Sequence, residues 1–283
     1  SNNTACGKGA LSANTTADNN TAVGKNALAA NTTGTQNVAV GNLALDANTT
    51  AANNTAIGYA ALSANTTGTR LVAIGMNALV ANTTANDNVA VGNNVLDANT
   101  TGTANVAMGY NSLGANTTTS NNTALGHKAL EVATGEQNTA IGSNALTSNT
   151  TASWNTAVGY IALALNTTGD KNTAVGSYAL DANTTASGNT ALGYAALTAN
   201  TTGAHLTAVG RGALAANTTA DSNTAVGSYS LNDVTTGAKN TGVGAYTLEK
   251  VSTADHNTAL GYNAGADITT GTANIAIGSY ALD

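Results

Sequence analysis

A 17-residue repeat runs through the whole of this 283-residue sequence. Residues 20–34 read NTAVGKNALAANTTG, residues 37–51 read NVAVGNLALDANTTA, and residues 54–68 read NTAIGYAALSANTTG. With the first Asn as position 1, copies begin at residues 3, 20, 37, 54, 71, 88, 105, 122, 138, 155, 172, 189, 206, 223, 240, 257 and 274. Every interval is 17 residues except the 16 between Asn122 and Asn138. A fixed short period of this kind is typical of a solenoid, in which each repeat forms one coil.

The composition favours a narrow core that is repeated lengthwise over one wide core. The chain has no Phe, no Pro, one Trp and one Cys, and only 8% of its residues are charged, against about 25% in an ordinary soluble domain. The net charge of −6 comes from 14 acidic and 8 basic residues scattered singly. Without a basic cluster, a nucleic-acid partner is not expected. No apolar run approaches the roughly 20 residues that span a bilayer.

The repeat predicts an all-β parallel β-solenoid of about 17 coils, with two short strands per coil. N-T-A-V-G is short, contains β-branched residues and ends in Gly, which is typical of a strand. The x-A-L-x-A segment that follows is predicted as the second strand, and N-T-T-G or N-T-T-A as a turn of small polar residues. A helix is the alternative, but Gly and Asn-Thr-Thr leave segments of about ten residues, too short for a stable isolated helix.

We expect residues 1–283 to form one uninterrupted array. Because the sequence opens and closes within a repeat, it is interpreted as a fragment or protomer of a longer fibre.

Three repeat positions are predicted to build the coil. Position 5 is Gly in all 17 copies, which indicates a corner with positive φ or a close backbone approach. Position 9 is Leu in every copy except Gly265, and position 4 is aliphatic or similar, with Cys6 interpreted there as a small buried hydrophobe. The corner glycines include Gly24, Gly41, Gly58 and Gly159. The predicted core includes Val23, Leu28, Val40, Leu45, Ile57, Leu62, Val158 and Leu163.

Position 3 is Ala in every copy except Gly242. If position 4 points inward on a pleated strand, position 3 points outward, and a small outward residue suggests contact with another chain. Under this interpretation Ala157, Ala174 and Ala191 are interface residues. The alternative is that position 3 lies at a kink and faces inward.

Asn at positions 1 and 12 could form side-chain amide ladders along the solenoid, as stacked Asn does in cross-β structures. The Asn-Thr-Thr segments are also formal N-glycosylation sequons. The alternative is that Asn and Thr simply suit a turn. The candidate glycosylation sites include Asn14, Asn31, Asn48, Asn65, Asn82 and Asn99.

The repeat carries no pattern typical of catalysis, and no enzyme activity, metal or cofactor is expected. His127, His205 and His256 lie on different coils without a repeating Cys or carboxylate partner, and acids such as Asp46, Asp97 and Asp181 are expected to be solvated.

All nine tyrosines fall at positions 6 or 7. They could stack on sugar rings or on another protomer, or could simply suit a half-exposed corner.

At N-x-A-[VI]-G-x-x-A-L, as in Ala22-Val23-Gly24, the repeat resembles the head repeats of YadA-type trimeric autotransporter adhesins. The NTAVGYxALxANTTG form also resembles repeats of phage tail-fibre-like and other surface-fibre proteins. The resemblance covers the whole chain. It implies a β-roll in each chain, packing between chains, and a role in adhesion. The adhesin heads usually repeat every 14 residues or so, whereas this chain repeats every 17.

Two functions from different classes follow from these patterns. The first is the shaft of an extracellular, cell-surface or virion fibre used in adhesion. Its expected partners are further copies of the chain, arranged laterally or end to end, and host-surface glycans. The second is an ice-binding solenoid that uses the Thr and Asn ladders, chiefly Thr at positions 13 and 14. Disorder is a third interpretation of the biased composition, which the regular Leu at position 9 disfavours.

Overall fold

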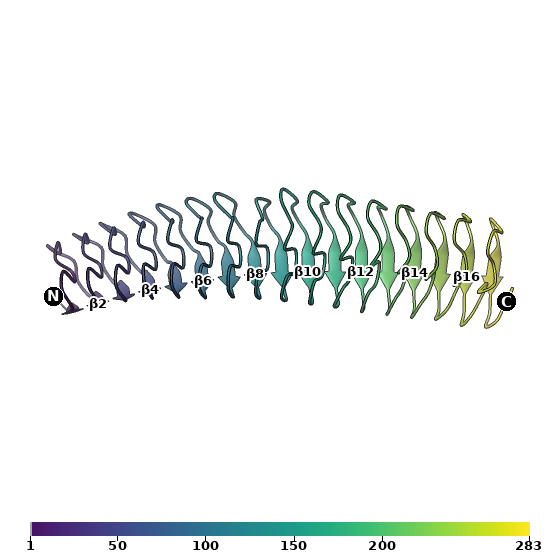
Figure 1. Cartoon of the computed structure of the whole chain (residues 1–283), viewed down its shortest axis with the longest axis horizontal. Coiled ribbons are helices and arrows are strands. Elements are labelled where there is room, and N and C mark those ends of the chain that lie inside the picture. Colours follow the sequence, from purple (N-terminus) through teal and green to yellow (C-terminus); the bar gives the residue numbers. More distant parts are fainter. Residues whose placement is uncertain (1) are drawn as a thin grey trace. The chain divides into compact units, whose positions relative to one another are not determined.

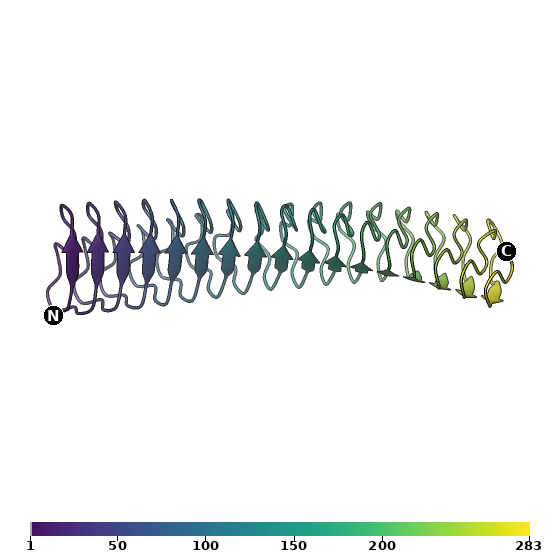
Figure 2. The same cartoon turned by 90° about the horizontal axis from the view of Figure 1, so that it is seen from below.

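The structure is a computed structural model that describes residues 2–283, which form strands and turns but no helix. Its contacts divide the chain into a first unit that ends at Asn138 and a second unit from Thr139 to Asp283. In each unit the coils are stacked with their strands side by side (Figure 1, Figure 2). The predicted all-β parallel solenoid is therefore confirmed.

Each coil contains one three-residue strand at positions 2 to 4 of the repeat. The strands of the first unit are β1 Thr4–Cys6, β2 Thr21–Val23, β3 Val38–Val40, β4 Thr55–Ile57, β5 Val72–Ile74, β6 Val89–Val91, β7 Val106–Met108 and β8 Thr123–Leu125. Those of the second unit are β9 Thr139–Ile141, β10 Thr156–Val158, β11 Thr173–Val175, β12 Thr190–Leu192, β13 Thr207–Val209, β14 Thr224–Val226, β15 Thr241–Val243, β16 Thr258–Leu260 and β17 Ile275–Ile277. Within each unit neighbouring strands are parallel, and equivalent repeat positions pair, such as Ala22 with Ala39.

The second predicted strand, x-A-L-x-A, does not form. Positions 7 and 9 adopt left-handed dihedrals, with φ of 57° at Asn26 and 53° at Leu28, so the segment is a series of turns. Its amides still bond to the next coil, as Leu28 N–H does to Ala44 C=O at 3.0 Å. A left-handed residue other than Gly costs about 1–2 kcal/mol. Burying a Leu contributes about 1.5–3 kcal/mol, and the fully buried Leu28 therefore offsets that strain.

The core prediction is confirmed at position 9 and wrong at position 4. Leu28, Leu45, Leu62 and Leu163 are all fully buried. The position-4 side chains instead point outward: Val23 and Ile57 are 37% and 38% exposed, Val40 and Val158 are half-buried, and Cys6 is exposed. Because alternate residues of a strand face opposite sides, position 3 occupies the interior.

The alanines of position 3 are therefore core residues, and the prediction of an interface at Ala157, Ala174 and Ala191 is wrong. All three are fully buried within the single chain. The one exception, Gly242, shows what limits their size. A Cβ added there would lie 2.6 Å from both Ser230 Oγ and Thr247 Oγ1, which stand at position 8, where Ala is usual. Positions 3 and 8 thus fill the same narrow interior, and at Gly242 the two hydroxyls leave no room for a Cβ.

The corner glycines are confirmed. Gly24 has φ of +134° and Gly159 of +141°, and Gly41 and Gly58 lie in the same region. A Cβ on Gly24 would lie 2.5 Å from Gly41 O in the next coil. Both the dihedral and the close approach of successive coils exclude a side chain at this corner.

The predicted asparagine ladders form, and they differ between the two positions. At position 12 the amides bond to one another along the stack, as Asn48 Nδ2 donates to Asn31 Oδ1 at 2.9 Å. At position 1 the amide bonds to backbone: Asn37 Oδ1 accepts the N–H of Asn54 at 3.0 Å, and Asn37 Nδ2 donates to Ala51 O at 2.9 Å. Since both positions are buried, these amides satisfy backbone groups that water cannot reach.

Replacing Leu163 with Ala should lower the free energy of unfolding by about 2–5 kcal/mol, because a fully buried side chain leaves a cavity. Denaturant unfolding followed by circular dichroism measures the change. Val158→Ala in the same coil is the control and should cost less, since Val158 is only half-buried. Equal losses in the two variants would contradict the inward position of Leu163.

Replacing Asn37 with Ala should also destabilise the solenoid. The substitution leaves the buried N–H of Asn54 without its acceptor, and an unsatisfied buried group costs about 1–3 kcal/mol. Asn42→Ala is the matched control, because Asn42 is exposed at position 6 of the same coil. If thermal unfolding shows the same midpoint for both variants, the ladder at position 1 does not stabilise the fold.

Candidate functional site: the outer sheet face

The side chains of strand positions 2 and 4 point away from the core and form a surface that we call the outer sheet face. In β2 the burial alternates along the strand, with Thr21 half-buried, Ala22 fully buried and Val23 exposed. The same alternation recurs in nearly every strand. No charged residue occurs in any of the strands. The outer sheet face is therefore a neutral surface of Thr and aliphatic side chains in strict register.

In the first unit the centre of this face is entirely apolar. Three successive strands, β5 to β7, carry only aliphatic residues and Met at positions 2 and 4, and exposed Met76 and Tyr110 lie beside them at position 6. Ile74, Val106 and Met108 are between 36% and 44% exposed. We call this surface the apolar patch, which consists of Val72, Ile74, Met76, Val89, Val91, Val106, Met108 and Tyr110.

In the second unit the face has a different composition. Eight successive strands, β9 to β16, carry Thr at position 2, and each pairs in register with the next, as Thr190 does with Thr207. We call these residues the threonine row: Thr139, Thr156, Thr173, Thr190, Thr207, Thr224, Thr241 and Thr258. Beside it runs a parallel row of Ile, Val and Leu at position 4. All eight Thr are exposed or half-buried.

The hydroxyls of the threonine row make no hydrogen bond to the described protein. The Thr at position 13 behave differently, because their hydroxyls bond to the next coil: Thr167 Oγ1 donates to Thr184 O at 2.9 Å, and Thr201 Oγ1 to Thr218 O at 3.1 Å. Position 13 therefore stabilises the stack. Position 14 also carries exposed Thr with hydroxyls that are unbonded within residues 2–283, such as Thr185 and Thr202. The strand Thr differ in that the second row beside them, at position 4, is aliphatic and uncharged.

Sequence reasoning missed the outer sheet face because it assigned the inward and outward residues of the strand the wrong way round. The signal was present in the repeat. Position 3 is uniformly Ala, whereas positions 2 and 4 both carry larger β-branched residues. A strand position that is always occupied by a small residue is as consistent with a narrow solenoid interior as with an interface to another chain.

Tyrosines form a second surface feature of the second unit, next to the strands. Tyr229, Tyr246, Tyr262 and Tyr280 stand on four successive coils, with ring centroids 5.5–6.0 Å apart. Arg211 lies over the ring of Tyr229 at 5.4 Å. Stacked and edge-to-face rings of this kind contribute about 0.5–1.5 kcal/mol per pair beyond their burial. The rings therefore stabilise neighbouring coils, and their exposed edges remain open to solvent.

The folded solenoid leaves the Asn side chains of most Asn-Thr-Thr sites inaccessible to a glycosylating enzyme. Asn31, Asn48, Asn65, Asn82 and Asn99 are fully buried, and their Nδ2 atoms donate hydrogen bonds within the stack. Asn14 is half-buried and donates to Ala17 O. The sequence carries a second set of sequons, in which Asn19, Asn53 and Asn121 stand two residues before a Thr and are exposed at position 17.

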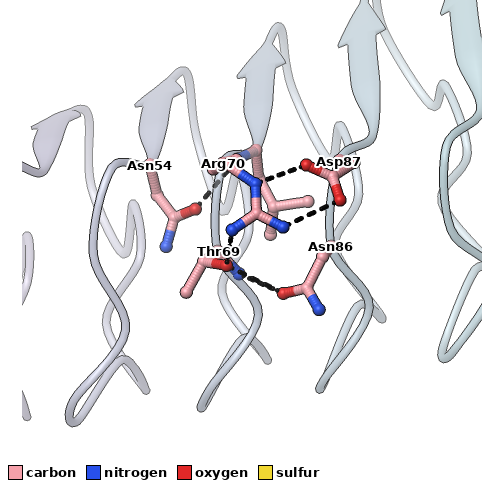
Figure 3. A network of polar contacts seen from close by, with 6 residues as sticks. Asn54, Thr69, Arg70, Asn86 and Asp87 are labelled. Carbon is pink, nitrogen blue, oxygen red and sulfur yellow. Dashed lines mark hydrogen bonds and ion pairs between the residues drawn. The ribbon is translucent and has the colours of Figure 1, made fainter.

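A few charged side chains pair between neighbouring coils, as Arg70 does with Asp87 and Lys250 with Asp267. Arg70 Nε donates to Asp87 Oδ1 at 2.6 Å, and Thr69 N–H donates to Asn86 Oδ1 at 2.7 Å (Figure 3). The hydrogen bond from Arg70 lowers the pKa of Asp87. Both side chains are well exposed, so the pair adds little stability.

Two acids of position 10, Asp46 and Asp97, are partly buried. Burial raises the pKa of Asp46 and Asp97, whereas the hydrogen bond from Arg70 lowers that of Asp87.

The predicted acids and histidines do not converge on a site. Asp181 accepts a hydrogen bond from Thr198 Oγ1 at 2.6 Å, and His127 stacks on Tyr110 with centroids 5.6 Å apart. Among residues 2–283 no group of three or more His, Cys, Asp or Glu is placed to hold a metal ion. That same part of the chain also lacks a helix long and apolar enough to cross a membrane.

Comparison with known proteins adds no functional assignment. No family model matches the chain, and no curated protein is similar to it.

Replacing Asp46 with Asn should raise the melting temperature at neutral pH. Burial lifts the pKa of Asp46 above its ordinary value of 3.8, and Oδ1 is buried without a hydrogen-bond partner. The carboxylate therefore destabilises the fold above its raised pKa, and this penalty disappears as the pH falls below 3.8. Melting curves across this range should show the advantage of the variant vanishing in acid. The control, Asp181→Asn, should show no such gain.

Proposed function

We propose that this chain is a structural segment of an extracellular, cell-surface or virion fibre that assembles laterally with further copies of itself. The observation that carries the proposal is the apolar patch of the first unit, which lies uncovered on the outer sheet face. The resemblance of the repeat to adhesin heads and surface-fibre proteins supports the same class of function.

The physical argument begins with the sheet. Parallel sheets normally have both faces covered, and a contiguous exposed apolar surface marks an interaction site. The coil interior covers one face, and within residues 2–283 no segment lies over the exposed Ile74, Val106 and Met108 side chains on the other. Solvation of this surface is unfavourable at about 25 cal/mol per Å².

A second copy of the chain is the partner that best matches the chemistry of the patch. Because the patch lacks charge, a complementary partner is equally neutral and apolar, and the chain itself carries such a face. Two copies can pack these faces against each other in an isologous contact, with sheets about 10 Å apart. The eight strands of the first unit, about 4.8 Å apart, make a face on the order of 40 Å long. With strands of three residues, its planar area is about 400 Å², so a stable contact of about 600–1,000 Å² per partner also needs the side chains that border the strands.

Adhesion would then use surfaces that the lateral contact leaves free. Tyr rings suit sugar rings, so the exposed edges of the tyrosines support host-surface glycans as a class of ligand. We also propose that the chain is not an enzyme, and the use of its buried Asn amides and position-13 hydroxyls in the coil ladders supports this.

Replacing Val89 with Lys at the centre of the apolar patch should abolish lateral assembly and leave the solenoid folded. The added charge would be desolvated in the contact, whereas in the free chain it reaches water. Light scattering across a concentration series measures assembly, and circular dichroism measures the fold.

The matched control is Thr84→Lys, which adds the same charge at an exposed turn position outside the patch. It should assemble like the unmodified chain. An unmodified chain that stays monomeric at high concentration would overturn the proposal, as would equal effects of the two lysines.

A further inference from the structure

We propose that the outer sheet face of the second unit, formed by the threonine row and the aliphatic row beside it, is an ice-binding surface. Its ligand is crystalline water. This function goes beyond the fibre role and uses different residues from the apolar patch.

The first support is the periodicity of the face. Thr occupies position 2 of eight successive strands, and every neighbouring pair is in register, from Thr156 with Thr173 to Thr241 with Thr258. Neighbouring strands lie about 4.7–4.9 Å apart, and residues two apart along a strand are separated by about 6.5–7 Å. The face therefore repeats in two directions, and the spacing along the stack lies close to that of oxygen atoms along an axis of hexagonal ice. In Figure 1 the strands of this unit form one continuous row.

The second support is the state of the hydroxyls. Those of the threonine row are not used by the described protein, so each can donate and accept one hydrogen bond at the surface. The methyl groups of Thr and the side chains of Val, Leu and Ile at position 4 belong to the same face, because residues two apart on a strand face the same way. A surface that combines fixed hydroxyls with methyl groups restricts the positions of the water molecules on it. Such ordered water resembles the lattice of ice more than it resembles liquid water.

The outer sheet face of the second unit is also rigid and uncharged, and both properties favour binding to ice. Thr and the Val and Ile of position 4 are β-branched and stiff at χ1, and the strands beneath them are paired with neighbours on both sides in the interior of the unit. Little side-chain entropy remains to be lost on binding. No charged side chain stands at positions 2 or 4 of any strand in the unit, so no strongly hydrated group interrupts the face.

An extended, uncharged ligand with a short repeat could also be a crystalline polysaccharide. Proteins usually hold sugar rings by aromatic stacking, and the tyrosines lie beside the face at positions 6 and 7. The face itself presents only hydroxyl and methyl groups. Ice is therefore the ligand that its chemistry favours, and crystalline cellulose serves as the competing probe.

The Thr of positions 13 and 14 supply a less suitable surface. Position 14 presents exposed hydroxyls, as at Thr185 and Thr202, but position 16 beside it carries the charged Asp170, Asp221 and Asp255. The hydroxyl of position 13 bonds to a carbonyl of the next coil, as Thr184 Oγ1 does to Thr201 O at 3.2 Å. The strand positions keep two aligned rows on one side, because residues two apart on a strand face the same way. The ice-binding hypothesis thus depends on the strand Thr.

The test compares the unmodified full chain with two variants by thermal hysteresis and by adsorption of labelled protein to a growing ice crystal. Thr207→Lys places a long charged side chain in the middle of the threonine row and should remove most of the hysteresis and the adsorption. Thr202→Lys adds the same charge at an exposed position off the face and should retain both activities. Circular dichroism establishes that both variants are folded.

An unmodified chain without hysteresis and without adsorption to ice would overturn the proposal. Equal losses in Thr207→Lys and Thr202→Lys would also overturn it, as would retention on crystalline cellulose together with exclusion from ice. Should Thr207→Lys fail to fold, Thr207→Val is the second variant, which keeps the shape and removes one hydroxyl. The fibre proposal is tested separately by Val89→Lys in light scattering, so either proposal can fail alone.

Discussion

The bonding of each coil to the next is the constraint on which the rest of this structure depends. The interior of each coil is filled by buried Leu, Ala and Asn side chains, so its backbone groups must be satisfied by the neighbouring coils or by buried amides. The strand supplies part of this bonding, and the left-handed turns supply more, as at Leu45 N–H to Ala61 O at 2.9 Å. Asn at positions 1 and 12 completes it. Removing one buried amide therefore affects two coils at once.

The narrow interior explains the composition of the repeat. Most coils bury one large side chain, the Leu of position 9, together with Ala and Asn, and a second one enters where it replaces the Asn of position 1, as Leu71 and Leu206 do. The corner Gly lets successive coils approach until a Cβ at Gly159 would lie 2.5 Å from Gly176 O. Because the core holds so few apolar side chains, the remaining aliphatic residues of the strand lie on the outside. The exposed face is thus a consequence of the coil's small cross-section.

That outward placement gives the two units different surfaces on the same scaffold. Position 2 is free of the constraints on the interior, and it is Val at Val72, Val89 and Val106 but Thr throughout β9 to β16. The outer sheet face of the first unit therefore suits a water-free contact with another sheet. That of the second unit presents a row of unbonded hydroxyls. Both proposals rest on this difference, and neither needs a pocket or a metal.

The period of 17, the corner Gly, the buried Leu and the Asn ladders could all be predicted from the sequence, because stacking identical coils places identical residues in contact. The number of strands per coil could not, since Leu is an unfavourable residue for left-handed dihedrals and takes them only because the coil buries it. The direction of the strand side chains was equally undetermined. An alternation of Ala with Val is compatible with either face being inside, and only the packing of position 3 against position 8, seen at Gly242 and Ser230, decided it. Burial of the Asn of position 12 likewise became clear only when the coils were stacked, because an Asn-Thr-Thr turn has the same sequence whether its amide faces water or the next coil.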